Sequence, residues 1–153
     1  MKRLNQILHL PCYQGWATTI LRVVTGIVFL AHGYKKIFAD GLSAFAGFLS
    51  QAGIPAPNFF APVVAGLELV GGLALIAGLL TRWAAILLAI EMLAAAVTVH
   101  LRNGFFLPNG YEYALVLLAA SVSLFLAGSG ECAVDNIIWH REKRTISANP
   151  AVA

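Results

Sequence analysis

Four long apolar stretches alternate with shorter polar segments along the chain. They cover residues 16–38, 59–80, 83–101 and 113–130. A helix needs about 20 mainly apolar residues to cross the hydrocarbon layer of a bilayer, and each stretch is close to that length. The pattern therefore predicts an all-α fold, a polytopic membrane protein whose four transmembrane helices form an antiparallel bundle.

The segments between these stretches differ in length. The second and third stretches meet at a tight turn, Thr81-Arg82, so we expect those two helices to be antiparallel neighbours. The first connection, residues 39–58, is much longer. Its apolar residues recur at helical spacing: Leu42, Phe45, Phe48 and Leu49. We predict a short amphipathic helix there, lying on the outer interface or over the bundle, with a re-entrant segment as the alternative.

The composition favours a membrane protein over a soluble one. The chain has 153 residues, of which 59% are hydrophobic and 11% are charged. A soluble domain averages about 45–50% apolar and about 25% charged residues. So few charges cannot cover a soluble globule, which argues against a soluble enzyme or a disordered chain. The net charge is only +3, so no nucleic-acid partner is expected, and the expected surroundings are a lipid bilayer.

The basic residues orient the predicted helices. Seven lie at the N-terminus, in or beside the second loop, or in the C-terminal tail: Lys2, Arg3, Arg22, Arg82, Arg141, Lys143 and Arg144. Three belong to the opposite side: Lys35, Lys36 and Arg102. Because cytoplasmic loops carry an excess of Lys and Arg, both termini are expected in the cytoplasm.

The predicted topology divides the chain into three parts. Residues 1–15 form an N-terminal segment, which we expect to be retained rather than cleaved as a signal peptide, and its apolar residues favour a short interfacial helix. Residues 16–138 form the four-helix membrane domain. Residues 139–153 form a polar cytoplasmic tail.

Ionisable residues interrupt the apolar stretches. They are Arg22, His32 and Lys36 in the first stretch, Glu68 in the second, Glu91 in the third and Glu112 at the start of the fourth. Such residues are costly in lipid and usually face the bundle interior or a cavity. Each shares a helix face with small residues, which let helices approach closely. We therefore expect a polar interior that opens toward the outer side, beneath the first outer loop.

Several interpretations of these residues stay open. Glu68 and Glu91 can pair with basic residues and simply hold the bundle together, or they can handle protons and bind a ligand. A metal site of His32, Glu68 and Glu91 lacks any spacing signature, and haem between His32 and His100 is disfavoured, so no metal site is assigned. The candidate catalytic residues are Glu68, His32 and Glu91, and the candidate cofactor-binding residues are Arg22, Lys36 and Glu112.

Three groups of motifs occur in order along the chain. They are Leu21-Arg22-Val-Val-Thr-Gly26 through His32-Gly33-Tyr-Lys35-Lys36, Gly66-Leu-Glu68-Leu-Val-Gly71-Gly72 through Thr81-Arg82, and Asn109-Gly110-Tyr-Glu112-Tyr113 followed by Gly128-Ser-Gly130. Together they resemble the DoxX family over about residues 16–138. The resemblance implies a four-helix protein of the bacterial inner (plasma) membrane. Some members of that family are tied to redox work, as subunits associated with a quinol oxidase or a thiosulfate:quinone oxidoreductase.

The resemblance and the polar interior together favour a redox-associated membrane subunit that contacts a quinone or a small reductant. Glu68 and His32 would exchange protons with the quinone, while Lys36 and Arg22 would balance charge. The alternatives are a small proton-coupled transporter component and a non-catalytic scaffold or assembly factor. The expected partners are a membrane or peripheral redox protein, and small-residue stripes would also permit a homodimer. No self-sufficient catalytic motif is present, so enzymatic activity of the chain alone stays open.

Overall fold

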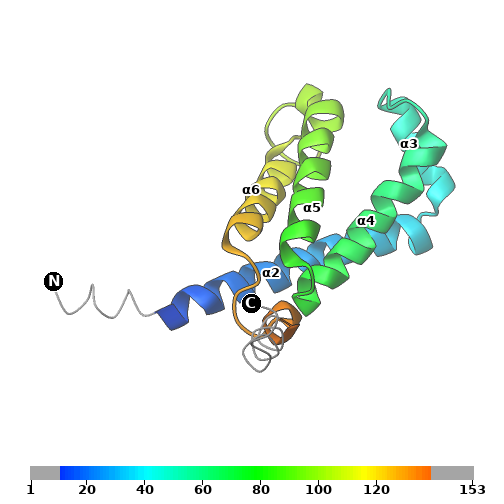
Figure 1. Cartoon of the computed structure of the whole chain (residues 1–153). Coiled ribbons are helices and arrows are strands. Elements are labelled where there is room, and N and C mark those ends of the chain that lie inside the picture. Colours follow the sequence, from blue (N-terminus) through cyan, green and yellow to red (C-terminus); the bar gives the residue numbers. More distant parts are fainter. Residues whose placement is uncertain (1–10, 139–153) are drawn as a thin grey trace, which may run out of the picture.

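The computed structural model describes residues 11–138, and every regular element in that range is helical (Figure 1). The α-helices are α2 (Pro11–Tyr34), α3 (Leu42–Gln51), α4 (Pro57–Ala77), α5 (Thr81–Ala95) and α6 (Glu112–Ala127). Helix α3 lies in the long first connection, which confirms the predicted short helix. The expected N-terminal interfacial helix and the C-terminal tail lie outside the described residues.

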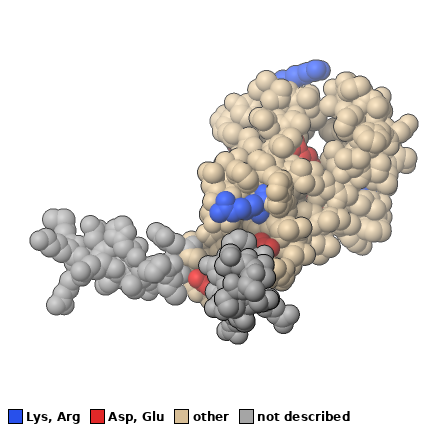
Figure 2. All heavy atoms as spheres, in the orientation of Figure 1, with Lys and Arg blue, Asp and Glu red and all other residues tan. Residues whose placement is uncertain are grey.

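Three helical segments are long and apolar enough to cross a membrane: Gly15–Ala39, Pro57–Ala77 and Thr81–Asn103. Helix α6 is also apolar but has only 16 residues, about 24 Å at 1.5 Å per residue. The sequence predicted a stretch up to residue 130, but the helix ends at Ala127 because Gly128 has a φ of 88°. The architecture confirms an all-α membrane bundle with a shorter fourth helix, and most of the surface in Figure 2 is uncharged.

Two of the long helices end in a wider turn. Helix α2 continues into a π-helical turn, η1 (Lys35–Ala39), and α5 continues into η2 (Ala96–His100) and a 3₁₀ turn, η3 (Leu101–Asn103). π-Turns are rare and are frequent at functional sites. Both lie at the same end of the bundle, the end at which α3 lies, because α2 and α5 run in the same direction.

Helices α2 and α4 pack with their backbones in close contact. A Cβ atom on Gly33 would lie 2.5 Å from the backbone nitrogen of Leu69, and one on Gly72 would lie 2.5 Å from that of Leu30. Any side chain larger than hydrogen at these two positions would force the helices apart. Glycine is therefore required by packing at both ends of this contact.

Arg22, in the middle of α2, binds the C-terminal end of α4. Its side chain is buried, with 1% of its surface exposed. Nη1 donates to the backbone oxygens of Leu75 at 2.5 Å and Ile76 at 2.9 Å, and Nη2 donates to that of Cys132 at 3.3 Å. The carbonyls at a helix C-terminus lack partners within the helix and carry partial negative charge. The guanidinium group of Arg22 therefore stabilises the end of α4 and holds the segment after α6 against it.

Asp135 performs the complementary role at the start of α5. Its carboxylate accepts hydrogen bonds from the backbone nitrogens of Leu80 at 2.7 Å and Thr81 at 3.0 Å. Its own backbone nitrogen donates to Gly78 at 2.9 Å. A carboxylate at a helix N-terminus satisfies free N–H groups and is favoured by the helix dipole. Asp135 therefore fixes the tight turn between α4 and α5.

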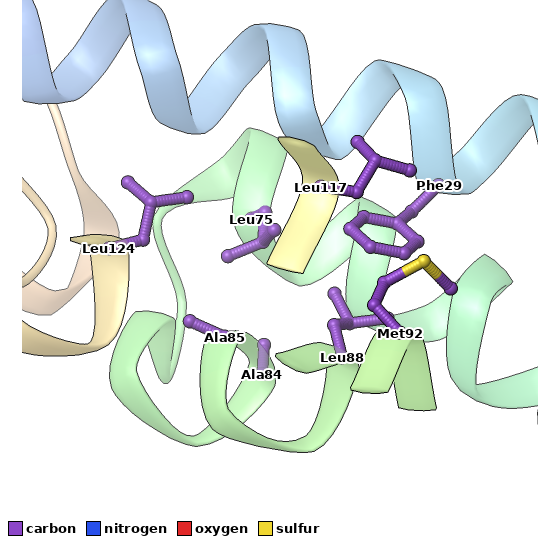
Figure 3. Packing of buried hydrophobic residues seen from close by; sticks show 8 residues of the cluster. All are labelled: Phe29, Leu75, Ala84, Ala85, Leu88, Met92, Leu117 and Leu124. Carbon is purple, nitrogen blue, oxygen red and sulfur yellow. The ribbon is translucent and has the colours of Figure 1, made fainter. Parts of the chain in front are cut away.

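Helices α4 and α5 meet near this turn and then diverge. The contact is made by Gly71, where an added Cβ would lie 3.1 Å from the side chain of Leu88. Leu88 belongs to the main core, with Phe29, Leu75, Ala84, Ala85, Met92, Leu117 and Leu124 (Figure 3). Beyond the core the bundle separates into two arms, one of α3 with α4 and the other of α5 with α6 (Figure 1).

The close contact of α2 and α4 predicts a strong effect of one added methyl group. We expect Gly72→Ala to lower the free energy of unfolding by about 2–3 kcal/mol, because the helices must separate to admit the methyl group. Gly66 is the matched control on the same helix, since nothing lies within 4 Å of an added Cβ there. Gly66→Ala should change stability by less than about 1 kcal/mol. Unfolding of the purified protein in mild detergent measures both, and equal effects would contradict the packing argument.

Candidate functional site

A cavity of about 730 Å³ lies between the two arms. In Figure 2 acidic side-chain atoms are visible beside the hollow between them. Most of the wall is apolar, and its larger side chains come from every long helix and from α3: Phe29, Phe45, Phe48, Leu49, Phe60, Val64, Leu67, Leu87, Ile90, Met92 and Leu117. A cavity of this size suits an organic molecule of moderate size. Because most of the wall is apolar, the cavity favours an apolar molecule.

Three ionisable side chains from three helices meet on this wall. Lys36 Nζ lies 2.5 Å from Glu68 Oε2, and the carboxyl of Glu91 is near enough to that of Glu68 for the two to interact electrostatically. Glu68 and Glu91 are 3% and 9% exposed. Two neighbouring carboxyls can share one proton between them. With the Lys36 ammonium group the cluster is then neutral, which suits a buried site in lipid.

One oxygen of this cluster lacks a partner. Glu91 Oε2 is buried, and no protein group in the described structure donates to it or accepts from it. Buried polar atoms are almost always hydrogen-bonded, so an unpartnered one at a cavity wall indicates a place for a ligand group or a water molecule. The unpartnered oxygen of Glu91 is therefore a candidate contact for a ligand in a mainly apolar cavity.

The backbone contacts explain why these residues meet. Glu68 precedes Gly71 by three residues and Glu91 follows Leu88 by three, so each lies about one helical turn beyond the contact at which α4 and α5 begin to diverge. Lys36 follows, by about one turn, the glycine contact of α2 with α4. The three side chains therefore converge on the narrow end of the space between the arms.

A second polar pair joins α2 to α6 across the cavity. Tyr113 Oη lies 3.4 Å from His32 Nε2, and the centroids of the two rings are 5.9 Å apart. Both residues line the cavity. Sequence reasoning selected His32 but missed Tyr113. The signal available was its position in the motif directly after Glu112, on the first turn of an apolar helix.

Helix α3 contributes an aromatic wall. Lys36 Nζ lies 4.7 Å from the centroid of the Phe45 ring, so the ammonium group contacts both an anion and an aromatic face. Ala46 and Leu49 of the same helix are buried against Ala61 of α4. The predicted amphipathic helix thus packs on the bundle and forms part of the cavity wall.

The structure separates the six predicted site residues into two groups. Four of them line the cavity together: His32, Lys36, Glu68 and Glu91. Arg22 instead holds the C-terminal end of α4 against the middle of α2, and Glu112 accepts a hydrogen bond from the backbone nitrogen of Leu107 at 2.8 Å. The distinction depends on depth: Arg22 lies about three turns before the contact of α2 with α4 at Gly33, and Glu112 is bonded within its own loop.

The structure also bears on the metal and haem hypotheses. Among the described residues, no three His, Cys, Asp or Glu side chains gather in an arrangement that could hold a metal ion. His100 does line the cavity, and its Nδ1 lies 3.0 Å from the backbone oxygen of Asn109. We therefore assign no metal-binding or haem-binding role to His100, although it lines the cavity.

Comparison with known proteins identifies the family. The DoxX family model matches residues 17–101, more than half of the chain. This protein belongs to the DoxX family. It is 36% identical over 126 residues to "Putative oxidoreductase CatD" of Bacillus subtilis, covering 82% of this chain and 90% of CatD. The match confirms the family resemblance drawn from the motifs.

Two further relatives have less informative descriptions. An uncharacterised membrane protein of Mycobacterium tuberculosis is 34% identical over 133 residues, covering 79% of this chain and 80% of that protein. An uncharacterised protein of Haemophilus influenzae is 33% identical, covering 84% and 95%. No solved structure matches this chain.

The ion pair of Lys36 and Glu68 leads to a stability prediction. We expect Lys36→Gln to lower the free energy of unfolding by about 3 kcal/mol, because it removes the only cation that is paired with the buried Glu68 within the described residues. The double variant Lys36→Gln with Glu68→Gln should recover most of that loss, since no charge is then stranded. Unfolding in mild detergent measures the coupling.

Lys35 is the matched control for this prediction. Its side chain is 63% exposed and pairs with Asp40 at the surface. Exposed ion pairs contribute about 1 kcal/mol or less, so Lys35→Gln should have little effect. Equal losses for the two lysine variants would show that burial of the Lys36–Glu68 pair has no energetic importance.

Proposed function

We propose that this DoxX-family protein binds a quinone in the cavity and exchanges protons with it, as a membrane subunit of an oxidoreductase. One observation carries the proposal. Two buried carboxyls, Glu68 and Glu91, line a mainly apolar cavity, and one oxygen of Glu91 has no partner among the described residues. Reduction of a quinone to a hydroquinone takes two electrons and two protons. A site for it needs apolar walls for the ring and a group that can both donate and accept a proton.

The carboxyl pair meets the second requirement. When Glu91 is protonated it can donate to a quinone carbonyl, and when it is ionised it can accept from a hydroquinone hydroxyl. The carboxyl pair would hold one proton and would protonate one quinone oxygen, the second proton would come from the His32 and Tyr113 side of the cavity, and both sides would take up new protons from water. Lys36 would stabilise whichever carboxylate carries the charge.

His32 and Tyr113 would supply a second polar contact. Their side chains lie within 3.4 Å of each other and come from α2 and α6. A quinone has two oxygens on opposite sides of its ring, so a second hydrogen-bonding pair on another part of the wall can hold the ring in one orientation. Imidazole is also the side chain that most readily carries protons near neutral pH.

The electrons would come from a membrane or peripheral redox protein, the partner class expected for such a subunit. The relative CatD, which is named a putative oxidoreductase, supports a redox role. We place the protein in the bacterial inner membrane with both termini in the cytoplasm, on the distribution of basic residues. In that orientation α3 and the cavity lie toward the outer side.

Replacement of the free acid tests the proposal. In purified protein in lipid nanodiscs, we expect Glu91→Gln to weaken binding of a decyl-substituted benzoquinone by about tenfold and to remove the change of affinity with pH, because an amide cannot gain or lose the proton. Isothermal titration calorimetry at several pH values measures both quantities.

Glu112→Gln is the matched control, because Glu112 lies outside the cavity and its amide oxygen can still accept from the backbone of Leu107. It should leave quinone affinity unchanged. If Glu91→Gln and Glu68→Gln behave like Glu112→Gln, the acids only hold the helices together, and the scaffold interpretation replaces this one. Proton-coupled uptake into vesicles without quinone binding would favour the transporter hypothesis.

A further inference from the structure

The wall between α4 and α5 differs from the rest of the cavity. Several side chains there line the cavity and are also exposed on the surface of the protein. Val63 of α4 is 47% exposed, and Leu87 and Ile90 of α5 are 47% and 58% exposed. A side chain can do both only at the rim of an opening. The cavity therefore has a mouth between α4 and α5, beyond their contact at Gly71 and Leu88.

This mouth lies at the depth of the lipid hydrocarbon. Val63 is six residues, about 9 Å, from the end of the membrane-crossing segment that begins at Pro57. Ile90 is 13 residues, about 20 Å, from the end of the segment that finishes at Asn103. Residues so far from the helix ends face acyl chains rather than water. A molecule that passes through the mouth comes from the bilayer.

The cavity also opens at the end where α3 lies, since Phe48 of α3 and Leu107 of the loop before α6 line it and are 48% and 56% exposed. Two further sides are closed or polar. Helices α2 and α4 are in backbone contact at Gly33 and Gly72, which leaves no passage between them. The side between α2 and α6 is bridged by the exposed polar pair His32 and Tyr113. The exposed side chains of α4 and α5 at the mouth, Val63, Leu87 and Ile90, are apolar, and Glu68 and Glu91 are buried on the same two helices.

We infer that the cavity is entered sideways from the bilayer between α4 and α5, and that its ligand carries a long apolar chain which stays in this mouth while the polar ring reaches Glu91. The inference rests on the proposed quinone site and specifies the substrate class as a long-chain membrane quinone. The polar anchor of Glu91 lies on the same helix as Ile90 and Leu87, so ring and chain can be bound along one continuous surface. Leaving the chain in hydrocarbon avoids the free-energy cost of moving its CH₂ groups into water.

The test narrows the mouth and compares two quinones that share a ring. The probes are a dimethoxy-methyl-benzoquinone with a decyl chain and the same ring without the chain, titrated into the full-length protein in nanodiscs. We expect Ile90→Trp to weaken binding of the decyl compound by about tenfold and to change binding of the chainless ring by less than about twofold. Leu93→Trp is the matched control, because Leu93 is 52% exposed on the same helix and does not line the cavity. It should change neither affinity.

A second variant, on the other helix of the mouth, allows the test to be made even if Ile90→Trp fails to fold. Val63→Trp narrows the mouth from α4, and its control is Val70→Trp, a position that is 65% exposed and outside the cavity. The same selective loss of the decyl compound supports the inference. Equal losses for both quinones, or none in either variant, overturn the sideways route while leaving the quinone site intact. Failure of the unmodified protein to bind either quinone overturns the proposed function as well.

The oligomeric state of the protein tests whether a second copy, rather than a quinone chain, covers the mouth. If Ile90→Trp and Val63→Trp dissociate a dimer of the unmodified protein, measured by light scattering after size-exclusion chromatography, a second copy covers the mouth and the inference is wrong. An unchanged oligomeric state together with the selective loss supports the chain-binding role.

Discussion

The close contact of α2 and α4 is the constraint on which the rest of the structure depends. Gly33 and Gly72 let the backbones of the two helices touch. This contact fixes the positions of the ionisable side chains of α2 relative to α4. At the inner end the contact brings Arg22 to the carbonyls of Leu75 and Ile76. At the other end it brings Lys36 to Glu68. The contact between α2 and α4 thus positions two cations: Arg22, which stabilises the fold, and Lys36, which belongs to the candidate site.

The candidate site follows from the shape of the remaining helices. Helices α4 and α5 are held together by their short turn, by Asp135 and by the Gly71–Leu88 contact, and they diverge beyond it. Ionisable groups placed one turn beyond such a contact are buried but still face a space. In lipid this arrangement suits a neutral cluster of one ammonium group and two carboxyls that share a proton, since each charge has a partner. The rest of the wall is mainly apolar, apart from the His32 and Tyr113 pair.

Much of the site was predictable because burial of charge in lipid is so costly. His32, Lys36, Glu68 and Glu91 stand out in apolar stretches, and their shared faces indicated a common interior. Arg22 has the same signature, yet it caps a helix, because a cation can also be satisfied by backbone carbonyls that the sequence does not reveal. Tyr113 was missed because a tyrosine near a helix end is ordinarily interpreted as an interfacial residue.

The sequence by itself determined the all-α membrane class, the approximate helix positions, the short helix in the first long connection and the membership of the family. It could do so because hydrophobic length and helical spacing are local properties. Tertiary structure alone decided that α6 stops at Ala127, that four of the six candidate residues share a cavity, and that the cavity has an apolar mouth between α4 and α5. These features depend on where helices touch and where they part, and that is set by contacts between residues far apart in the chain.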